Sequence, residues 1–155
     1  MWLIRRLLLP LSLLPLPALA ADEIAALLAL PAAPAGVVFE IAGREGDLEW
    51  AVPRLRDYTA RLRQRFPLLP IAVVSHGREQ FALLQAAAPQ QQEVQQGIQA
   101  LAEHEEVSVH VCGVNAERRG TAPEEFVPYI DVAAEGPAQI RDYEALGYIR
   151  VRLRR

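Results

Sequence analysis

The hydrophobic pattern of the chain is that of an alternating α/β protein. Short runs rich in valine and isoleucine predict strands, and segments with apolar residues at helical spacing separate them. The predicted strands cover residues 37–42, 71–75, 106–113, 131–135 and 148–153. The main predicted helices cover 48–66, 90–103 and 136–147, with shorter helices after residues 81 and 121. This alternation favours right-handed crossovers, and therefore a flavodoxin-like three-layer α/β sandwich with a mostly parallel sheet of about five strands.

The strand predicted over residues 106–113, EVSVHVCG, ends on the only cysteine of the chain. Three valines alternate with Ser108, His110 and Cys112, so one side of the strand is purely apolar and the other is polar. Gly113 follows and lets the backbone turn away. We therefore expect the thiol near the carboxyl end of a central strand, the edge at which ligands bind in open α/β sheets.

Residues 1–20 have the three parts of a secretory signal peptide. Arg5 and Arg6 precede a leucine-rich run, and Ala18-Leu19-Ala20 forms a small-residue cleavage site. The alternative is a membrane anchor, but three prolines interrupt the apolar run, which is shorter than the roughly 18 residues needed to span a bilayer. We therefore expect a periplasmic or secreted protein with no stable membrane span.

After the leader, residues 21–36 are rich in proline and alanine and predict a linker, within which 24–30 could form a short helix. The folded domain is expected to cover residues 37–155. The net charge of −3 argues against a nucleic-acid-binding protein, because such proteins need a basic face. A single cysteine excludes an internal disulfide.

Four segments give the chain a resemblance to the DsrE/DsrF-like (sulfur relay, YchN-like) family, of which it would be an exported member. They are VVSHG at 73–77, VHVCG at 109–113, GTAPEEFVP at 120–128 and ALGYIRV at 145–151. The resemblance implies a small α/β domain that assembles into trimers or hexamers. For some members it also implies a cysteine that carries sulfane sulfur as a persulfide, and that cysteine matches Cys112.

Cys112 is thus the candidate catalytic residue, and its neighbours decide whether it reacts. A thiol with an ordinary pKa of about 8.5 needs nearby positive charge or a helix amino terminus to ionise at neutral pH. Arg118 and Arg119 follow within reach of a loop. The resemblance implies a polar Asn-Thr pair just after the cysteine, and here only Asn115 is present, in a displaced position. The alternative for Cys112 is a small, inert, buried side chain.

Two histidines are further supporting candidates. His110 lies on the same strand face as Cys112, and a purely structural histidine is the competing interpretation. His76 ends the predicted strand 71–75, and a flavodoxin-like strand order would place it roughly 10 Å from the thiol, across two strand spacings. The spacing of these residues matches no common zinc-site pattern, so we expect no metal and no cofactor.

Two functions from different classes remain open. In the first, Cys112 accepts sulfane sulfur from a donor protein or compound and passes it to an acceptor thiol. In the second, the chain is a non-catalytic, exported, oligomeric module that binds a protein or a small ligand. The reactivity of Cys112 in the folded protein distinguishes the two.

Overall fold

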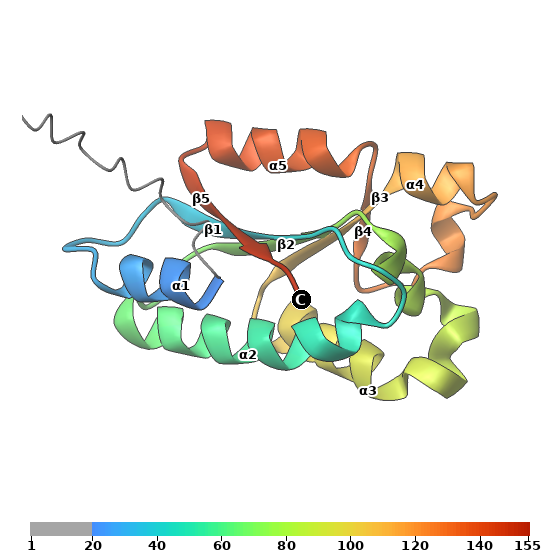
Figure 1. The fold of residues 1–155 in the computed structure, drawn as a ribbon, viewed down its shortest axis with the longest axis horizontal. Coiled ribbons are helices and arrows are strands. Elements are labelled where there is room, and N and C mark those ends of the chain that lie inside the picture. The colour runs from blue at the N-terminus through green and yellow to red at the C-terminus, as the bar shows by residue number, and fades with distance from the viewer. Residues whose placement is uncertain (1–19) are drawn as a thin grey trace, which may run out of the picture.

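The computed structural model describes residues 20–155, which form a five-stranded parallel sheet with helices on both faces (Figure 1). The spatial order of the strands is β4-β3-β2-β1-β5. Their bounds are Gly36–Ile41 for β1, Ile71–Ser75 for β2, Ser108–Cys112 for β3, Asp131–Ala133 for β4 and Tyr148–Leu153 for β5. This architecture confirms the predicted flavodoxin-like α/β sandwich and the predicted number of strands.

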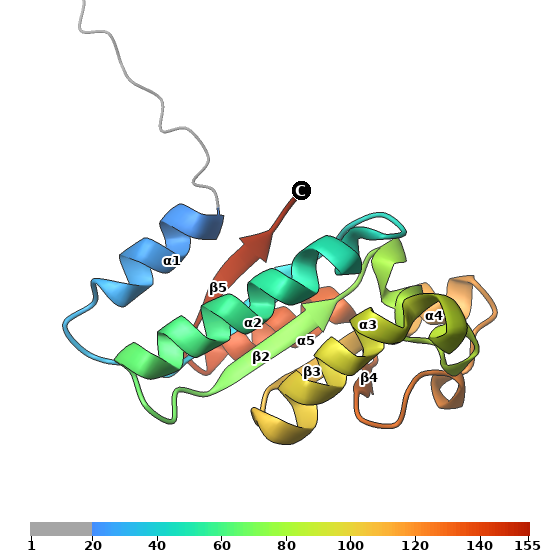
Figure 2. The same ribbon diagram turned by 90° about the horizontal axis from the view of Figure 1, so that it is seen from below.

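The expected position of β2 was wrong. β2 lies between β1 and β3, and not on the far side of β1. The reason is that α2 (Asp47–Arg65) and α3 (Ala88–Gln99) pack on the same face of the sheet, so successive right-handed crossovers advance in one direction (Figure 2). Helix α5 (Gly136–Ala145) crosses the opposite face and carries the chain back to β5, beyond β1 (Figure 1).

Short helical segments replace two stretches that were predicted differently. The helix expected after residue 81 is a pair of 3-10 turns, η1 (Arg78–Leu83) and η2 (Gln85–Ala87). Helix α4 (Gly113–Arg118) begins directly after β3, in a segment without clear periodicity, and the 3-10 turn η4 (Pro123–Glu125) follows it. A π-helical turn, η3 (Ala100–His104), extends α3. These turns shape the loops at the sheet edges.

Residues 20–28 form helix α1 (Ala20–Leu28), so the predicted linker is only partly extended. Ile24 and Leu27 are buried in the main core, because α1 packs against α2 and β5. Helix α1 is thus packed onto the domain that was expected to cover residues 37–155. The predicted signal peptide lies outside the described residues except for Ala20. Within residues 20–155, no helix is both long and apolar enough to cross a membrane.

Candidate functional site

Cys112 is the last residue of β3, and its side chain is buried, with 4% of the residue exposed. The backbone N–H of Gly136, the first residue of α5, donates a hydrogen bond to Cys112 Sγ over 3.3 Å. The thiol thus lies at the carboxyl edge of the sheet and against the first turn of a ten-residue helix. Both a backbone donor and the positive end of the helix dipole favour negative charge on the sulfur.

Gln80 holds the backbone of Cys112 in place. The Cys112 N–H donates to Gln80 Oε1 over 2.9 Å, and Gln80 Nε2 donates to the Cys112 carbonyl oxygen over 3.2 Å. Gln80 is completely buried and belongs to the 3-10 turn η1. Its amide acts as a strand partner at the point where β3 ends. The sequence carried one weak signal for this role, a glutamine directly before the apolar run that starts at Phe81.

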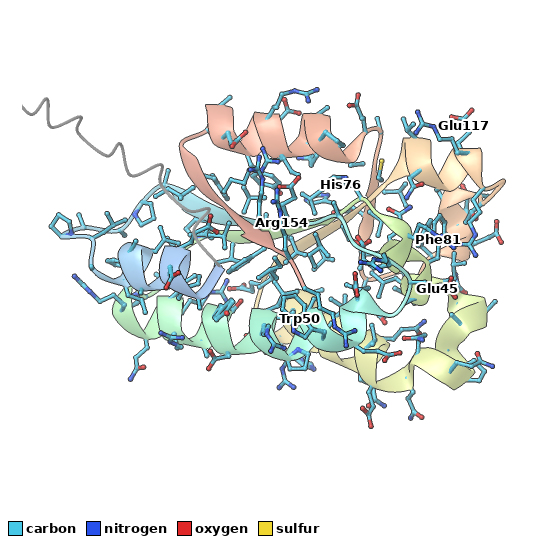
Figure 3. All side chains as sticks on the ribbon, in the orientation of Figure 1. Glu45, Trp50, His76, Phe81, Glu117 and Arg154 are labelled. Carbon is cyan, nitrogen blue, oxygen red and sulfur yellow. The ribbon has the colours of Figure 1, made fainter. Side chains whose placement is uncertain are left out.

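His76 lies beside Cys112 and not two strands away. β2 and β3 pair in parallel with Ser75 opposite Val111, so the next position sets His76 opposite Cys112. A Cβ atom added to Gly136 would lie 2.5 Å from His76 Cβ and 3.2 Å from Cys112 Cβ. Both side chains therefore border the start of α5. Figure 3 shows His76 on the side of the sheet that α5 covers. The expected separation was too large because it assumed the wrong strand order.

Glu40, on β1, is the hydrogen-bond partner of His76 and was missed in the sequence. Its Oε1 lies 2.9 Å from His76 Nε2, while Oε2 accepts from Arg150 and Arg152 of β5, with Arg152 Nε at 2.9 Å. Burial by itself would raise the pKa of Glu40, but the hydrogen bonds from His76 and the two arginines outweigh it and lower the pKa to about 2. A carboxylate within an otherwise apolar strand was the available signal.

Asn115, in α4, binds the loop that carries His76. Its Nδ2 donates to the carbonyl oxygen of Gly77 over 2.8 Å and to that of His76 over 3.3 Å. The segment after Cys112 is thereby fixed to the segment after β2. The structure brings Asn115 to the site as a backbone clamp.

Glu79 is a second carboxylate that the sequence analysis missed. It is completely buried and joins the loops after β1 and β2, because it accepts hydrogen bonds from Ser75 Oγ, Gly77 N–H and Gly43 N–H. Burial raises the pKa of Glu79, and these three donors oppose that rise. Glu79 thus fixes the loop in which His76 and Gly77 lie.

His110 shares a sheet face with Cys112 but has another partner. Its Nε2 lies 2.8 Å from the hydroxyl oxygen of Tyr143 in α5. Burial lowers the pKa of His110, and the neighbouring Asp131 carboxylate partly opposes that shift. The imidazole is therefore part of the packing between β3 and α5.

Arg118 and Arg119 lie at the end of α4, and both are exposed. The Arg119 guanidinium stacks over the Phe81 ring, 4.2 Å from its centroid. Among the hydrogen bonds and ion pairs of residues 20–155, none joins either arginine to Cys112. Arg150 and Arg152 bind Glu40 on the neighbouring strand β1, and not Cys112. In the same part of the chain, no group of three or more histidine, cysteine, aspartate or glutamate residues is placed to hold a metal ion.

Two solved structures share this fold. MTH1491 from Methanobacterium thermoautotrophicum, titled a protein of unknown function, has a TM-score of 0.60 and 19% sequence identity, covering 75% of this chain and 96% of its own. The ychN protein from E. coli has a TM-score of 0.55 and 14% identity, covering 76% of this chain and 98% of its own. No family model matches the chain, and no curated protein matches it in sequence. The chain thus has the fold that its resemblance to the DsrE/YchN-like family implies.

Proposed function

We propose that the chain is a sulfur carrier in which Cys112 holds sulfane sulfur as a persulfide. The observation that carries this proposal is the hydrogen bond from Gly136 N–H to Cys112 Sγ at the first turn of α5. An anionic sulfur at this position is stabilised by the backbone donor and by the helix dipole. The family resemblance implies the same function, and the fold shared with the ychN protein agrees with that resemblance.

The transfer needs no oxidant or cofactor. The Cys112 thiolate attacks the outer sulfur of a sulfane donor, such as inorganic polysulfide, and a new S–S bond forms. The bond between that sulfur and the rest of the donor breaks, and its electron pair leaves with the shortened polysulfide. Because the chain has no second cysteine, Cys112 holds the persulfide until an acceptor thiol on another molecule attacks it.

The proposal includes the place and state in which the carrier works. The arginine-containing leader supports export to the periplasm or the medium. The family resemblance supports a trimer or a hexamer. Light scattering on the purified protein tests the assembly, and amino-terminal sequencing of the exported fraction tests cleavage of the leader.

Intact-mass spectrometry after incubation with inorganic polysulfide tests the transfer. Wild-type protein should gain the mass of one sulfur atom, and a reductant should remove it. The C112S variant should fold with nearly unchanged stability and gain nothing. If wild-type protein gains no sulfur, or if its thiol resists alkylation until the protein unfolds, the carrier function is wrong.

A second candidate, a ligand-binding module, is favoured by a different observation. A hollow of about 630 Å³ lies at the carboxyl ends of β1 and β5 and is lined in part by Arg44, Trp50 and Arg154. Trp50 and Arg154 are labelled in Figure 3. The order of the strands in the sheet reverses between β1 and β5, which run parallel. Open α/β sheets bind ligands at such switch points. Loss of sulfur uptake together with an inert Cys112 would leave this function in place.

A further inference from the structure

We propose that His76, oriented by Glu40, accepts the proton of the Cys112 thiol. The inference rests on the proposed sulfur-carrier function and names the proton acceptor of that same site. It concerns a row of side chains from three neighbouring strands: Cys112 at the end of β3, His76 after β2 and Glu40 on β1. We call these three residues the polar row.

His76 and Cys112 lie side by side at the ends of two paired strands. His76 and Cys112 occupy opposite places in the parallel register of β2 and β3, whose backbones lie roughly 4.8 Å apart. Their Cβ atoms both lie close to the point that a Cβ atom on Gly136 would occupy, at 2.5 Å for His76 and 3.2 Å for Cys112. Only a residue without a side chain fits at this point of α5, so no α5 side chain stands between His76 and Cys112 at Gly136.

The second argument is the hydrogen-bonding state of the imidazole. Glu40 is ionised at every pH above its pKa of about 2, so its oxygens accept hydrogen bonds and do not donate them. The proton of the neutral ring therefore lies on Nε2, which is 2.9 Å from Glu40 Oε1. The lone pair is left on Nδ1, the nitrogen bonded to Cγ, and Cγ borders the start of α5. The basic nitrogen is thus one bond away from the ring atom that borders Gly136.

The third argument is that the orienting group is itself fixed. Glu40 Oε2 accepts from Arg150 Nη2 over 2.6 Å and from Arg152 Nε over 2.9 Å. The clamp from Asn115 to the carbonyl groups of His76 and Gly77 holds the histidine backbone from the other side. The ring is therefore restrained in position and in tautomer before any donor arrives.

Few other groups near the polar row can take a proton at neutral pH. Besides Glu40, which belongs to the row, the charged groups that contact it are Arg150 and Arg152 from β5. Glu79 lies buried under the loop after β2. His110 and Asp131, from β3 and β4, lie further along the same face, where His110 binds Tyr143. The first turn of α5, Gly136-Pro137-Ala138-Gln139, has no ionisable side chain.

The proton balance of the step is complete. The thiol gives its proton to His76 Nδ1, and the resulting thiolate forms the S–S bond with the donor's outer sulfur. The shortened polysulfide leaves with the electron pair of the broken bond. It takes up the proton from the imidazolium, which returns His76 to its neutral form.

Alkylation of Cys112 by iodoacetamide, measured from pH 5.5 to 9.5, tests the inference without any sulfur donor. At pH 6.5 the H76N variant should react about tenfold more slowly than wild-type protein, because an unassisted thiol is only a few per cent ionised near neutrality. Above about pH 9 the two rates should converge, since the thiol then ionises without help. The matched control is H104N, which replaces an exposed histidine before β3 and should leave the profile unchanged.

Glu40 and Arg152 are tested as positioning residues in the same assay. Like H76N, E40Q should slow the alkylation of Cys112 at pH 6.5. R152Q should slow it by a smaller factor, because it removes one of two arginine donors to Glu40. Thermal unfolding of each variant shows that it is folded. R152Q changes a half-exposed residue and keeps the test valid if E40Q does not fold.

The outcomes separate this inference from the proposed function. If H76N and wild-type protein show the same pH profile, the inference is overturned, whatever the mass measurement gives. If wild-type protein gains no sulfur from polysulfide while H76N still slows alkylation, the carrier function fails and the proton assignment stands. A wild-type thiol that reacts only above pH 8 also overturns the inference.

Discussion

The face of the sheet under α1, α2 and α3 is closed by apolar side chains, whereas the face under α5 also carries a line of polar ones. The first face holds the large core, which includes Phe39, Leu55 and Val109. The second holds a small apolar cluster of Val38, Ala72, Val74 and Ile140. Toward the carboxyl edge the α5 face continues into Glu40, His76 and Cys112.

The difference follows from how much helix covers each face. Several helices cover the first face, so an unpaired polar group there would have no water and no partner. A single ten-residue helix covers the second, and the side chains of Arg150 and Arg152 beside it keep 26% and 48% of their exposure. Charged groups can therefore reach both water and one another there. One face supplies most of the stability, and the other provides room for chemistry.

The first prediction, with the largest expected effect, concerns a substitution in the core on the α1, α2 and α3 face. Leu55→Ala should lower the free energy of unfolding by about 2 to 5 kcal/mol, toward the upper end, because the residue is fully buried among several elements. Ile140→Ala on α5 should lie toward the lower end of that range, because a lone covering helix can settle into the space. Urea unfolding of both variants measures this, and an equal or larger loss for Ile140→Ala would contradict the comparison.

The second prediction concerns acid unfolding and the α5 face. The pKa of Glu40 in the folded protein is about 2, below its ordinary value of 4.5, so its stabilising contribution is present above pH 4.5 and lost as the pH falls toward 2. Wild-type protein should lose about 2 to 3 kcal/mol of stability from this group across that window. E40Q should start less stable but show a flatter decline. Urea unfolding at several pH values checks this, and parallel declines would refute it.

The third prediction tests how tightly α5 closes on the polar row. Gly136→Ala should destabilise the protein by about 1 to 3 kcal/mol, because the added methyl group would lie 2.5 Å from His76 Cβ and force α5 outward. The control Ala145→Ser, at the exposed end of the same helix, should change little. Thermal unfolding measures both. A neutral Gly136→Ala would show that the helix start tolerates movement.

Local patterns predicted the strands, the parallel sheet and the position of Cys112, because alternation of valines and a following glycine are properties of neighbouring residues. The strand order was not predictable in the same way, since it depends on which face each helix covers. Helix α1 was also underestimated, because two buried residues, Ile24 and Leu27, are too few to give a clear period.

The partners at the site were harder still to find. Glu40 accepts a hydrogen bond from Arg152, which is 112 residues further along the chain. Gln80 donates to the backbone of Cys112, which is 32 residues further along. The local sequence marks Glu40 and Gln80 as polar residues in or beside apolar runs, but it does not indicate which residues they contact. His76 and Asn115 were found because they follow strand ends or the cysteine. Arg118 and Arg119, found by the same rule, are both exposed, and Arg119 stacks on Phe81.

The smallest expected effect separates His110 from the polar row on the same face. Burial lowers the pKa of His110 below its ordinary value of 6.5, so the unfolded chain takes up the proton first. Its contribution to stability is therefore present above pH 6.5 and lost as the pH falls below it.

H110Q keeps a polar group near Tyr143 but does not titrate. Between pH 7.5 and 5.5 it should lose less stability than wild-type protein, by about 1 kcal/mol or less, because Asp131 limits the pKa shift. Urea midpoints at the two pH values measure the difference, with H104Q as the exposed control. An equal loss in H110Q and wild-type protein would contradict the prediction.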